Sequence, residues 1–211
     1  MRILIITDSL GLPSRYVNMD DMWVYKIIKE FKQHEFITIQ RGGLSTRDLY
    51  YKTIKHMNVD LIITQIGIVD CCRRPCFKII SDTLFELLKN YKILKVIKRN
   101  MYKLTRLYDY KYVNKSGFDI NVGKINKLAK KVYFIKIAGP GISLKNKIFN
   151  VENDIKDYNN ILKKFNLIDP YKNKKDYLIV EDGHHLNKKG QNLVYNEVKK
   201  KLFSWTDGQM S

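Results

Sequence analysis

Short apolar runs alternate along the chain with longer segments in which apolar residues recur at helical spacing. Their length and β-branched content predict strands for five of these runs, at residues 3–7, 36–40, 61–66, 132–137 and 177–180. Helical spacing predicts five helices, at residues 22–31, 46–57, 82–97, 154–165 and 188–203. Strands that alternate with helices predict a parallel sheet, covered by helices on both faces, in a three-layer α/β/α sandwich.

The chain is long enough for one domain, which we expect over residues 1–205 with a frayed end at 206–211. The stretch over residues 98–123 interrupts the alternation and is rich in basic residues. It also holds four tyrosines, Tyr102, Tyr108, Tyr110 and Tyr112. We expect a variable surface excursion here, and the alternative is a cap over a functional site.

The first segment with candidate chemistry is Thr7-Asp8-Ser9, which directly follows the first predicted strand. Ligands of parallel sheets bind at this edge, beyond the carboxyl ends of the strands. A tight turn here could present the hydroxyl of Ser9 as a nucleophile, provided that a base lies beside it. Ser9 could instead cap a helix, and Gly11 could let a phosphate approach.

The second segment contains Asp182 and His185, three residues apart across a glycine-containing turn before the last predicted helix. Such a turn can fold the carboxylate against the imidazole, which fixes the tautomer of the ring. Alternatively, His184 and His185 are polar surface residues or a weak metal pair. Together with Ser9, the segment predicts a Ser-His-Asp triad in which His185 is the base and His184 the alternative base.

These segments resemble the sequence blocks of the SGNH/GDSL hydrolases, a family of esterases and acetylesterases. The first block of that family is a Gly-Asp-Ser turn, similar to Thr7-Asp8-Ser9, and the last is Asp-x-x-His, matched within residues 182–190. The two middle blocks correspond to Arg41-Gly42-Gly43 and Gly67-Ile68-Val69-Asp70. The resemblance extends from residue 7 to residue 190, and it implies the flavodoxin-like, five-stranded SGNH hydrolase fold.

The resemblance also implies a role for each matching residue. Ser9 would attack an ester carbonyl, His185 would take its proton and Asp182 would orient His185. The backbone N–H groups of Ser9 and of Gly43 or Gly42 would form the oxyanion hole. This chemistry requires no metal and no organic cofactor.

One departure from the family pattern concerns the oxyanion hole. Val69 stands where the family has an asparagine that donates to the oxyanion. Gln65, Arg73 and Arg74 are candidates to replace that donor, and the two arginines could also bind the substrate. Asp70 is retained and is expected to brace its loop.

The net charge of +18 raises the question of a polyanionic partner. However, 31 of the 39 basic residues are lysine, whereas proteins that read nucleic acids favour arginine for bidentate contacts. We therefore expect a lysine-solvated surface and no specific nucleic-acid partner.

Cysteines and apolar segments bear on metal binding and location. Cys71, Cys72 and Cys76 are too clustered for a disulfide framework and lack the spacing of a zinc site. No apolar run is long enough to span a membrane, and the N-terminal run is too short for a signal peptide. A cytoplasmic location is therefore expected.

The function that these patterns favour is hydrolysis of a small acyl ester, preferably an O-acetyl group, on a small molecule or a glycan. One alternative is a sugar O-acyltransferase that uses the same serine. The other is a non-catalytic module that binds a polyanion or a glycan.

Overall fold

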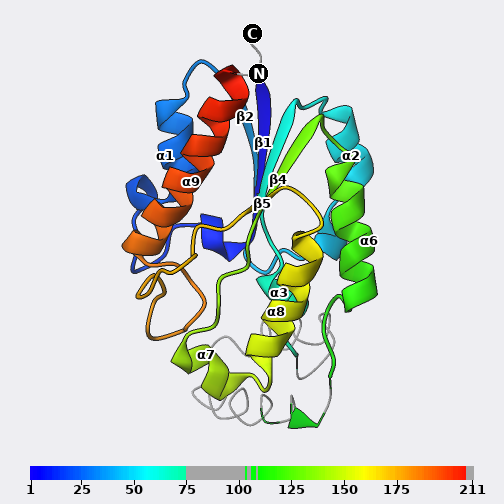
Figure 1. Ribbon diagram of the computed structural model, residues 1–211, viewed down its shortest axis with the longest axis vertical. Coiled ribbons are helices and arrows are strands. Elements are labelled where there is room, and N and C mark those ends of the chain that lie inside the picture. Colours follow the sequence, from blue (N-terminus) through cyan, green and yellow to red (C-terminus); the bar gives the residue numbers. More distant parts are fainter. Residues whose placement is uncertain (75–102, 104–105, 108, 208–211) are drawn as a thin grey trace, which may run out of the picture.

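The computed structural model describes residues 1–74, 103, 106–107 and 109–207 (Figure 1). Five parallel strands form one sheet in the order β2-β1-β3-β4-β5. The strands are β1 (Arg2–Thr7), β2 (Glu35–Gln40), β3 (Leu61–Gln65), β4 (Lys131–Ile135) and β5 (Leu167–Ile168). The order reverses between β1 and β3, and ligands bind at such a switch point in open parallel sheets.

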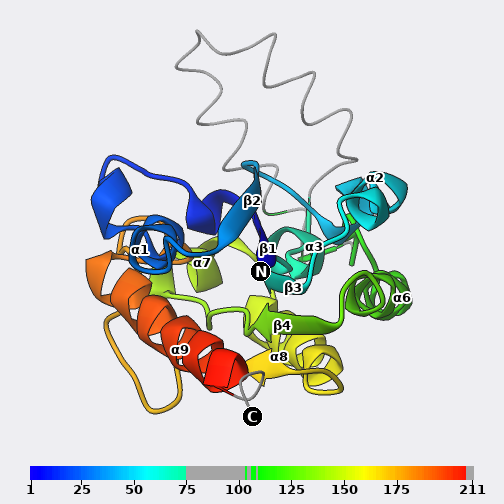
Figure 2. The ribbon, with the colours of Figure 1, turned by 90° about the horizontal axis from the view of Figure 1, so that it is seen from above.

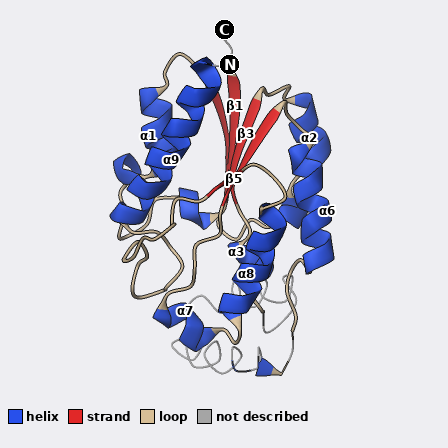
Figure 3. Cartoon of the chain, in the orientation of Figure 1, coloured by secondary structure: helices blue, strands red, loops and turns tan. Residues whose placement is uncertain are grey.

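Helices cover both faces of the sheet, as expected for the three-layer class. On one face lie α1 (Trp23–Glu30) and α9 (Lys188–Asp207), and on the other α2 (Tyr51–His56), α6 (Lys115–Asn126) and α8 (Val151–Leu162), as Figure 2 shows. Two short helices, α3 (Ile68–Cys71) and α7 (Ile142–Lys147), lie beyond the carboxyl ends of the strands (Figure 3). Three 3₁₀ turns complete the described part, η1 (Ser9–Gly11), η2 (Met19–Asp21) and η3 (Thr46–Asp48).

The central strand β1 contributes to two hydrophobic cores because its side chains alternate across the sheet. Leu4 and Ile6 are buried under α2, α6 and α8, whereas Ile3 and Ile5 are buried under α1 and α9. This two-sided burial explains why the strand is a continuous apolar run. The polar residues that follow it therefore emerge at the edge of the sheet.

The predicted strand at residues 177–180 is wrong. Leu178 forms only an isolated antiparallel bridge with Leu186, and the N–H of Ile179 donates to the carbonyl of His185 at 2.8 Å. The segment thus pairs with the residues that follow it instead of joining the sheet. The fifth strand is β5, whose two residues are too few for an apolar pattern to reveal.

The predicted excursion is corrected in its second half. Residues 115–123 belong to α6, and Phe118, Val122 and Ile125 of this helix are buried in the core. The ring of Phe118 lies 4.8 Å from that of Tyr158 in α8, between centroids. The lysines and tyrosines that precede α6 concealed its helical spacing.

Several predictions concern residues that the structure does not describe. The predicted helix at 82–97 is one of them, as are Tyr102, Tyr108 and Cys76. Cys71 and Cys72 are buried free thiols. Within the described ranges, no helix combines the length and the apolar character needed to cross a membrane.

Replacing Phe118 by alanine should strongly destabilise the fold if α6 is a core helix. The fully buried ring would leave a cavity, and such truncations cost about 3–5 kcal/mol. Ile120→Ala on the same helix is the matched control, since Ile120 is 58% exposed and its loss should cost less than about 0.5 kcal/mol. Urea unfolding measures both, and equal losses would contradict this placement of α6.

Candidate active site

Ser9 begins the turn η1 at the carboxyl end of the central strand. Asp8 caps this turn, because its Oδ1 accepts a hydrogen bond from the N–H of Leu10 at 2.9 Å. Gly11 closes the turn against Thr7, where a Cβ atom on residue 11 would lie 2.1 Å from the Thr7 hydroxyl. The turn therefore fixes the backbone of Ser9 at the switch point of the sheet.

The structure brings Ser9 together with His185 and Asp182. Ser9 Oγ lies 2.9 Å from His185 Nε2, across 176 residues of sequence. Nδ1 of His185 lies 3.0 Å from Asp182 Oδ2. With the ring proton on Nδ1, this N–H donates a hydrogen bond to the Asp182 carboxylate. The lone pair of Nε2 then faces the hydroxyl of Ser9.

Asp182 is held in its ionised form. Burial alone would raise the pKa of this carboxyl group, but the N–H groups of His184 and His185 donate to Oδ1, each at 2.9 Å, and the neighbouring imidazoles also favour the charge. The net effect lowers the pKa of Asp182 below its usual value of 3.8. The carboxylate can therefore orient His185 and stabilise its imidazolium form.

The turn that carries Asp182 depends on two glycines. Gly183 has φ +70°, and a Cβ atom there would lie 2.7 Å from the backbone nitrogen of Leu144. Its carbonyl accepts a hydrogen bond from the N–H of Gly141 at 2.7 Å. After the turn, Asn187 caps α9, because its Oδ1 accepts from the N–H of Gly190 at 3.0 Å.

His184 lies beside the triad, and its ring centroid is 4.1 Å from that of His185. Burial, with a smaller contribution from the neighbouring His185, lowers the pKa of His184 to about 4, so His184 is neutral at neutral pH. His185, not His184, reaches Ser9. In the described part of the chain, Asp182, His184 and His185 have the spacing of a metal site, but a metal would have to replace the contact between Asp182 and His185.

A cavity of about 210 Å³ opens beside Ser9. Its lining includes Gly43, Val69, Arg74, Lys147 and His184. Gly43 follows β2 with φ +70°, whereas Gly42 does not line the cavity. Val69 thus lies beside the candidate nucleophile with an apolar side chain, where the resemblance in sequence implies a donor.

No protein-family model matches the chain, and no curated protein matches its sequence. Solved structures match it over nearly its whole length. A carbohydrate acetylesterase from Sinorhizobium meliloti is 12% identical with a TM-score of 0.61, and the match covers 97% of this chain and 99% of that one. The aryl esterase of M. smegmatis is 13% identical with a TM-score of 0.61, over 96% and 98%. A member of the lipolytic protein G-D-S-L family from Veillonella parvula is 12% identical with a TM-score of 0.58, over 94% and 96%.

The chain has the SGNH hydrolase fold. At these identities the likeness establishes the fold, and it confirms the predicted fold class and its flavodoxin-like sheet. The three residues of the candidate triad lie at the edge of this fold where parallel sheets bind their ligands.

In this SGNH hydrolase fold, two of the predicted site residues have structural partners. Gln65 accepts a hydrogen bond from Trp23 Nε1 at 2.7 Å and donates one to the hydroxyl of Tyr171 at 3.2 Å, and it does not line the cavity beside Ser9. Arg73 forms an ion pair with Asp154 at 2.9 Å. Of the three candidates for the missing donor, only Arg74 lines the cavity.

Asp70 contacts the loop after β2, where its Oδ1 accepts from the N–H and the hydroxyl of Thr46 at 2.9 and 2.7 Å. Burial raises the pKa of Asp70 to about 6.

Asp8, which sequence reasoning did not select, is also fully buried. Burial, with a smaller contribution from the charge of Asp70, raises the pKa of Asp8 to about 7. The carboxyl groups of Asp8 and Asp70 are therefore both weaker acids than those of exposed aspartates.

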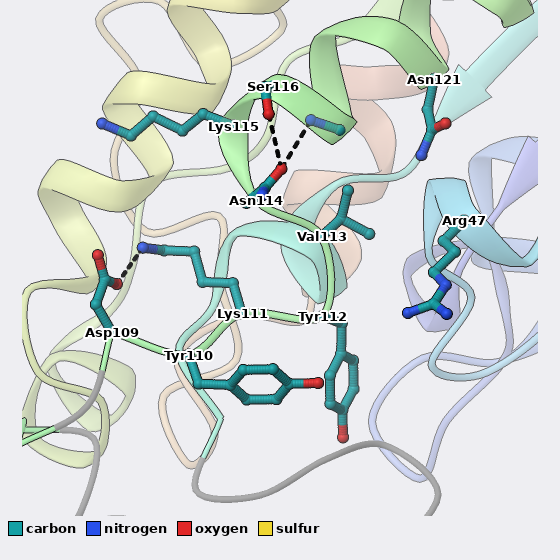
Figure 4. Close-up of a pocket in the computed structure, with 11 residues that line it drawn as sticks. Arg47, Asp109, Tyr110, Lys111, Tyr112, Val113, Asn114, Lys115, Ser116 and Asn121 are labelled. Atoms are coloured by element: carbon teal, nitrogen blue, oxygen red, sulfur yellow. Dashed lines mark hydrogen bonds and ion pairs between the residues drawn. The ribbon is translucent and has the colours of Figure 1, made fainter.

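A larger cleft of about 820 Å³ lies near the described end of the predicted excursion (Figure 4). Tyr110 and Tyr112 line it with their rings edge to face, 6.3 Å apart. Lys111 lies between them in sequence and pairs with Asp109, while Arg47 lines the opposite wall. The residues before α6, together with α6 itself and Arg47, thus line a tyrosine-containing cleft.

Asp8→Asn should flatten the dependence of stability on pH. Because the pKa of Asp8 is about 7 in the folded chain and about 3.8 when unfolded, the folded chain binds more protons between these values, and its stability falls as the pH rises through that window. The variant has no carboxyl group to ionise at this position. Between pH 4 and pH 8 its free energy of unfolding should therefore rise relative to that of the wild type by about a few kcal/mol.

Urea unfolding at pH 4 to 8 measures this difference. Asp20→Asn, which removes an exposed carboxylate of η2, is the control and should keep the wild-type slope. The same slope in Asp8→Asn as in the wild type would contradict the placement of an ionisable Asp8 in the core.

Proposed function

We propose that the chain is a serine esterase that cleaves a small acyl ester through Ser9, His185 and Asp182. The observation that carries the proposal is the alignment of hydroxyl, imidazole and carboxylate, with contacts of 2.9 and 3.0 Å. A hydroxyl is a weak nucleophile, and a neutral imidazole at hydrogen-bond distance is the base that activates it. A non-catalytic binding module would not require this alignment.

In the proposed reaction, Ser9 Oγ attacks the ester carbonyl while His185 Nε2 takes the hydroxyl proton. The tetrahedral intermediate collapses, the alcohol leaves with the proton from His185, and the acyl group stays on Ser9. Water then attacks the acyl-enzyme with His185 again as the base, which releases the acid and restores the hydroxyl. Asp182 keeps Nδ1 of His185 protonated throughout.

The developing oxyanion would be stabilised by the N–H groups of Ser9 and Gly43. Gly43 lines the cavity beside Ser9, and so does Val69, whose side chain has no donor. Since one donor in such a hole contributes about 10²–10³ in rate, the proposed enzyme works with a smaller hole than its resemblance implies. Arg74 is the described cavity residue that could supply a further donor.

The preferred substrate is an O-acetyl ester on a carbohydrate. A cavity of about 210 Å³ suits a small acyl group. Structures with the same fold include a carbohydrate acetylesterase and two acetyl xylan esterases, one of them from Geobacillus stearothermophilus. A sugar O-acyltransferase would use the same acyl-enzyme, with a sugar hydroxyl in place of water as the acceptor.

Ser9→Ala and His185→Ala should each lower kcat/KM for 4-nitrophenyl acetate by at least about 10³-fold, because each removes one element of a unit that acts together. The matched controls are Ser204→Ala on α9 and His56→Ala on α2, both at exposed positions far from the triad in sequence. Release of nitrophenol measures all four. Near-wild-type turnover in either triad variant would contradict the assignment of Ser9 and His185 as nucleophile and base.

Val69→Asn should raise kcat by about tenfold or more, since it places an amide donor on the wall of the cavity beside Ser9. Val69→Ala serves as the control, because it removes a similar amount of apolar contact and adds no donor. The proposed two-donor hole is contradicted if the asparagine variant is no faster than the alanine variant.

A further inference from the structure

The charged side chains that line the cavity beside Ser9 are basic in the described part of the chain. Arg74 and Lys147 line it, and none of its lining residues in the described part of the chain is acidic. Much of the remaining wall is apolar and comes from Ile68, Leu144 and Ile148. Charges beside apolar walls are screened less than charges in open water, so the two cations act strongly on any group that enters.

Arg74 is held in place from both its backbone and its side chain. Its N–H donates to the carbonyl of Tyr110 at 2.8 Å, and its guanidinium carbon lies 5.0 Å from the centre of the Tyr112 ring. Nη2 lies 3.5 Å from the carbonyl of Val69. A planar guanidinium fixed in this way is suited to bind a carboxylate through two parallel hydrogen bonds.

The neighbouring arginine has a different role. Arg73 pairs with Asp154, and Lys111 approaches the other oxygen of the same carboxylate at 3.2 Å. These contacts join the segment around residue 111 to α8, and the isolated bridge between Arg73 and Lys111 continues the connection. Arg74, the next residue, lines the cavity.

Lys147 reaches the cavity from the end of α7. Leu144, on the same helix, meets the turn at Gly183 that carries Asp182. The helix that carries Lys147 therefore lies against the turn that carries Asp182.

Arg74 and Lys147 both act on the thiol of Cys72, and Lys147 also acts on His184; Cys72 and His184 line the cavity. A hydrogen bond from Cys71, together with the charges of Arg74 and Lys147, lowers the pKa of the Cys72 thiol. Burial is the main cause that lowers the pKa of His184, and the neighbouring His185 and the charge of Lys147 act in the same direction. The smaller contributions of Arg74 and Lys147 have the sign expected of a positive potential inside the cavity.

We propose that the ester accepted by this site carries an anionic group, a carboxylate on either its acyl or its alcohol part, which Arg74 and Lys147 bind in the cavity. This inference rests on the proposed esterase function and narrows its substrate class. For a carbohydrate ester, it points to an acidic sugar or a dicarboxylic acyl group instead of a neutral acetylated sugar. The selectivity comes from the charge and placement of the two cations beside the nucleophile.

The experiment compares two pairs of esters on the intact chain. On the acyl side, 4-nitrophenyl hydrogen adipate is compared with 4-nitrophenyl heptanoate, and on the alcohol side 3-acetoxybenzoate with 3-acetoxybenzamide. We expect kcat/KM to be at least about tenfold higher for the anionic member of one pair, which also identifies the side that enters the cavity. The ratio within a pair is the readout, so differences in overall rate cancel.

Lys147→Gln and Arg74→Gln should each lower that ratio by about fivefold or more, since each removes one positive charge. Lys145→Gln is the matched control on α7, because Lys145 pairs with Glu152 and does not line the cavity. The control should keep the wild-type ratio.

The outcomes separate this inference from the function on which it rests. Hydrolysis of the neutral esters without an anionic preference in either pair would overturn the inference and leave the esterase in place. An anionic preference that survives in both glutamine variants would also overturn it. No hydrolysis of any of the four esters would overturn the proposed function and this inference with it.

Discussion

Gly141 and Gly183 lie backbone to backbone where the loop after β4 meets the turn that carries Asp182. The Gly141 N–H donates to the carbonyl of Gly183 at 2.7 Å, and a Cβ atom on residue 141 would lie 2.9 Å from the Cα atom of Gly183. No strand of the sheet holds this turn, since the segment before it forms its isolated bridge with Leu186 and donates a backbone hydrogen bond to His185. The alignment of His185 with Ser9 therefore depends on a contact that a single methyl group on either glycine would disturb.

Four acidic and imidazole groups around the nucleophile show how local partners decide charge. Two N–H donors keep Asp182 ionised despite burial, whereas burial makes Asp8 a much weaker acid. His184 stays neutral beside the base, His185, which contacts both Ser9 and Asp182. One negative charge is thus available to orient the base, and the cavity itself carries only cations among its described charged residues.

Much of this arrangement could be predicted, because long buried strands and the order of polar segments at one edge of a sheet follow from local patterns. The residues 177–180 were misassigned because a β-rich segment that pairs with its own continuation has the same pattern as a strand. The helix α6 escaped notice because lysines and tyrosines precede its apolar stripe. The separate roles of Arg73 and Arg74 depend on Asp154, which is 81 residues away from Arg73 in sequence. A local sequence pattern cannot reveal a contact between residues so far apart.

The central claim is that Ser9 is a nucleophile activated by His185. A fluorophosphonate probe tests it most directly, because it forms a covalent bond only with a serine whose proton a neighbouring base removes. Incubation of the intact chain, followed by peptide mass spectrometry, should place one adduct on Ser9, and labelling should disappear in His185→Ala and persist in His56→Ala. An unlabelled wild-type chain, or an adduct that forms equally well without His185, would contradict the account.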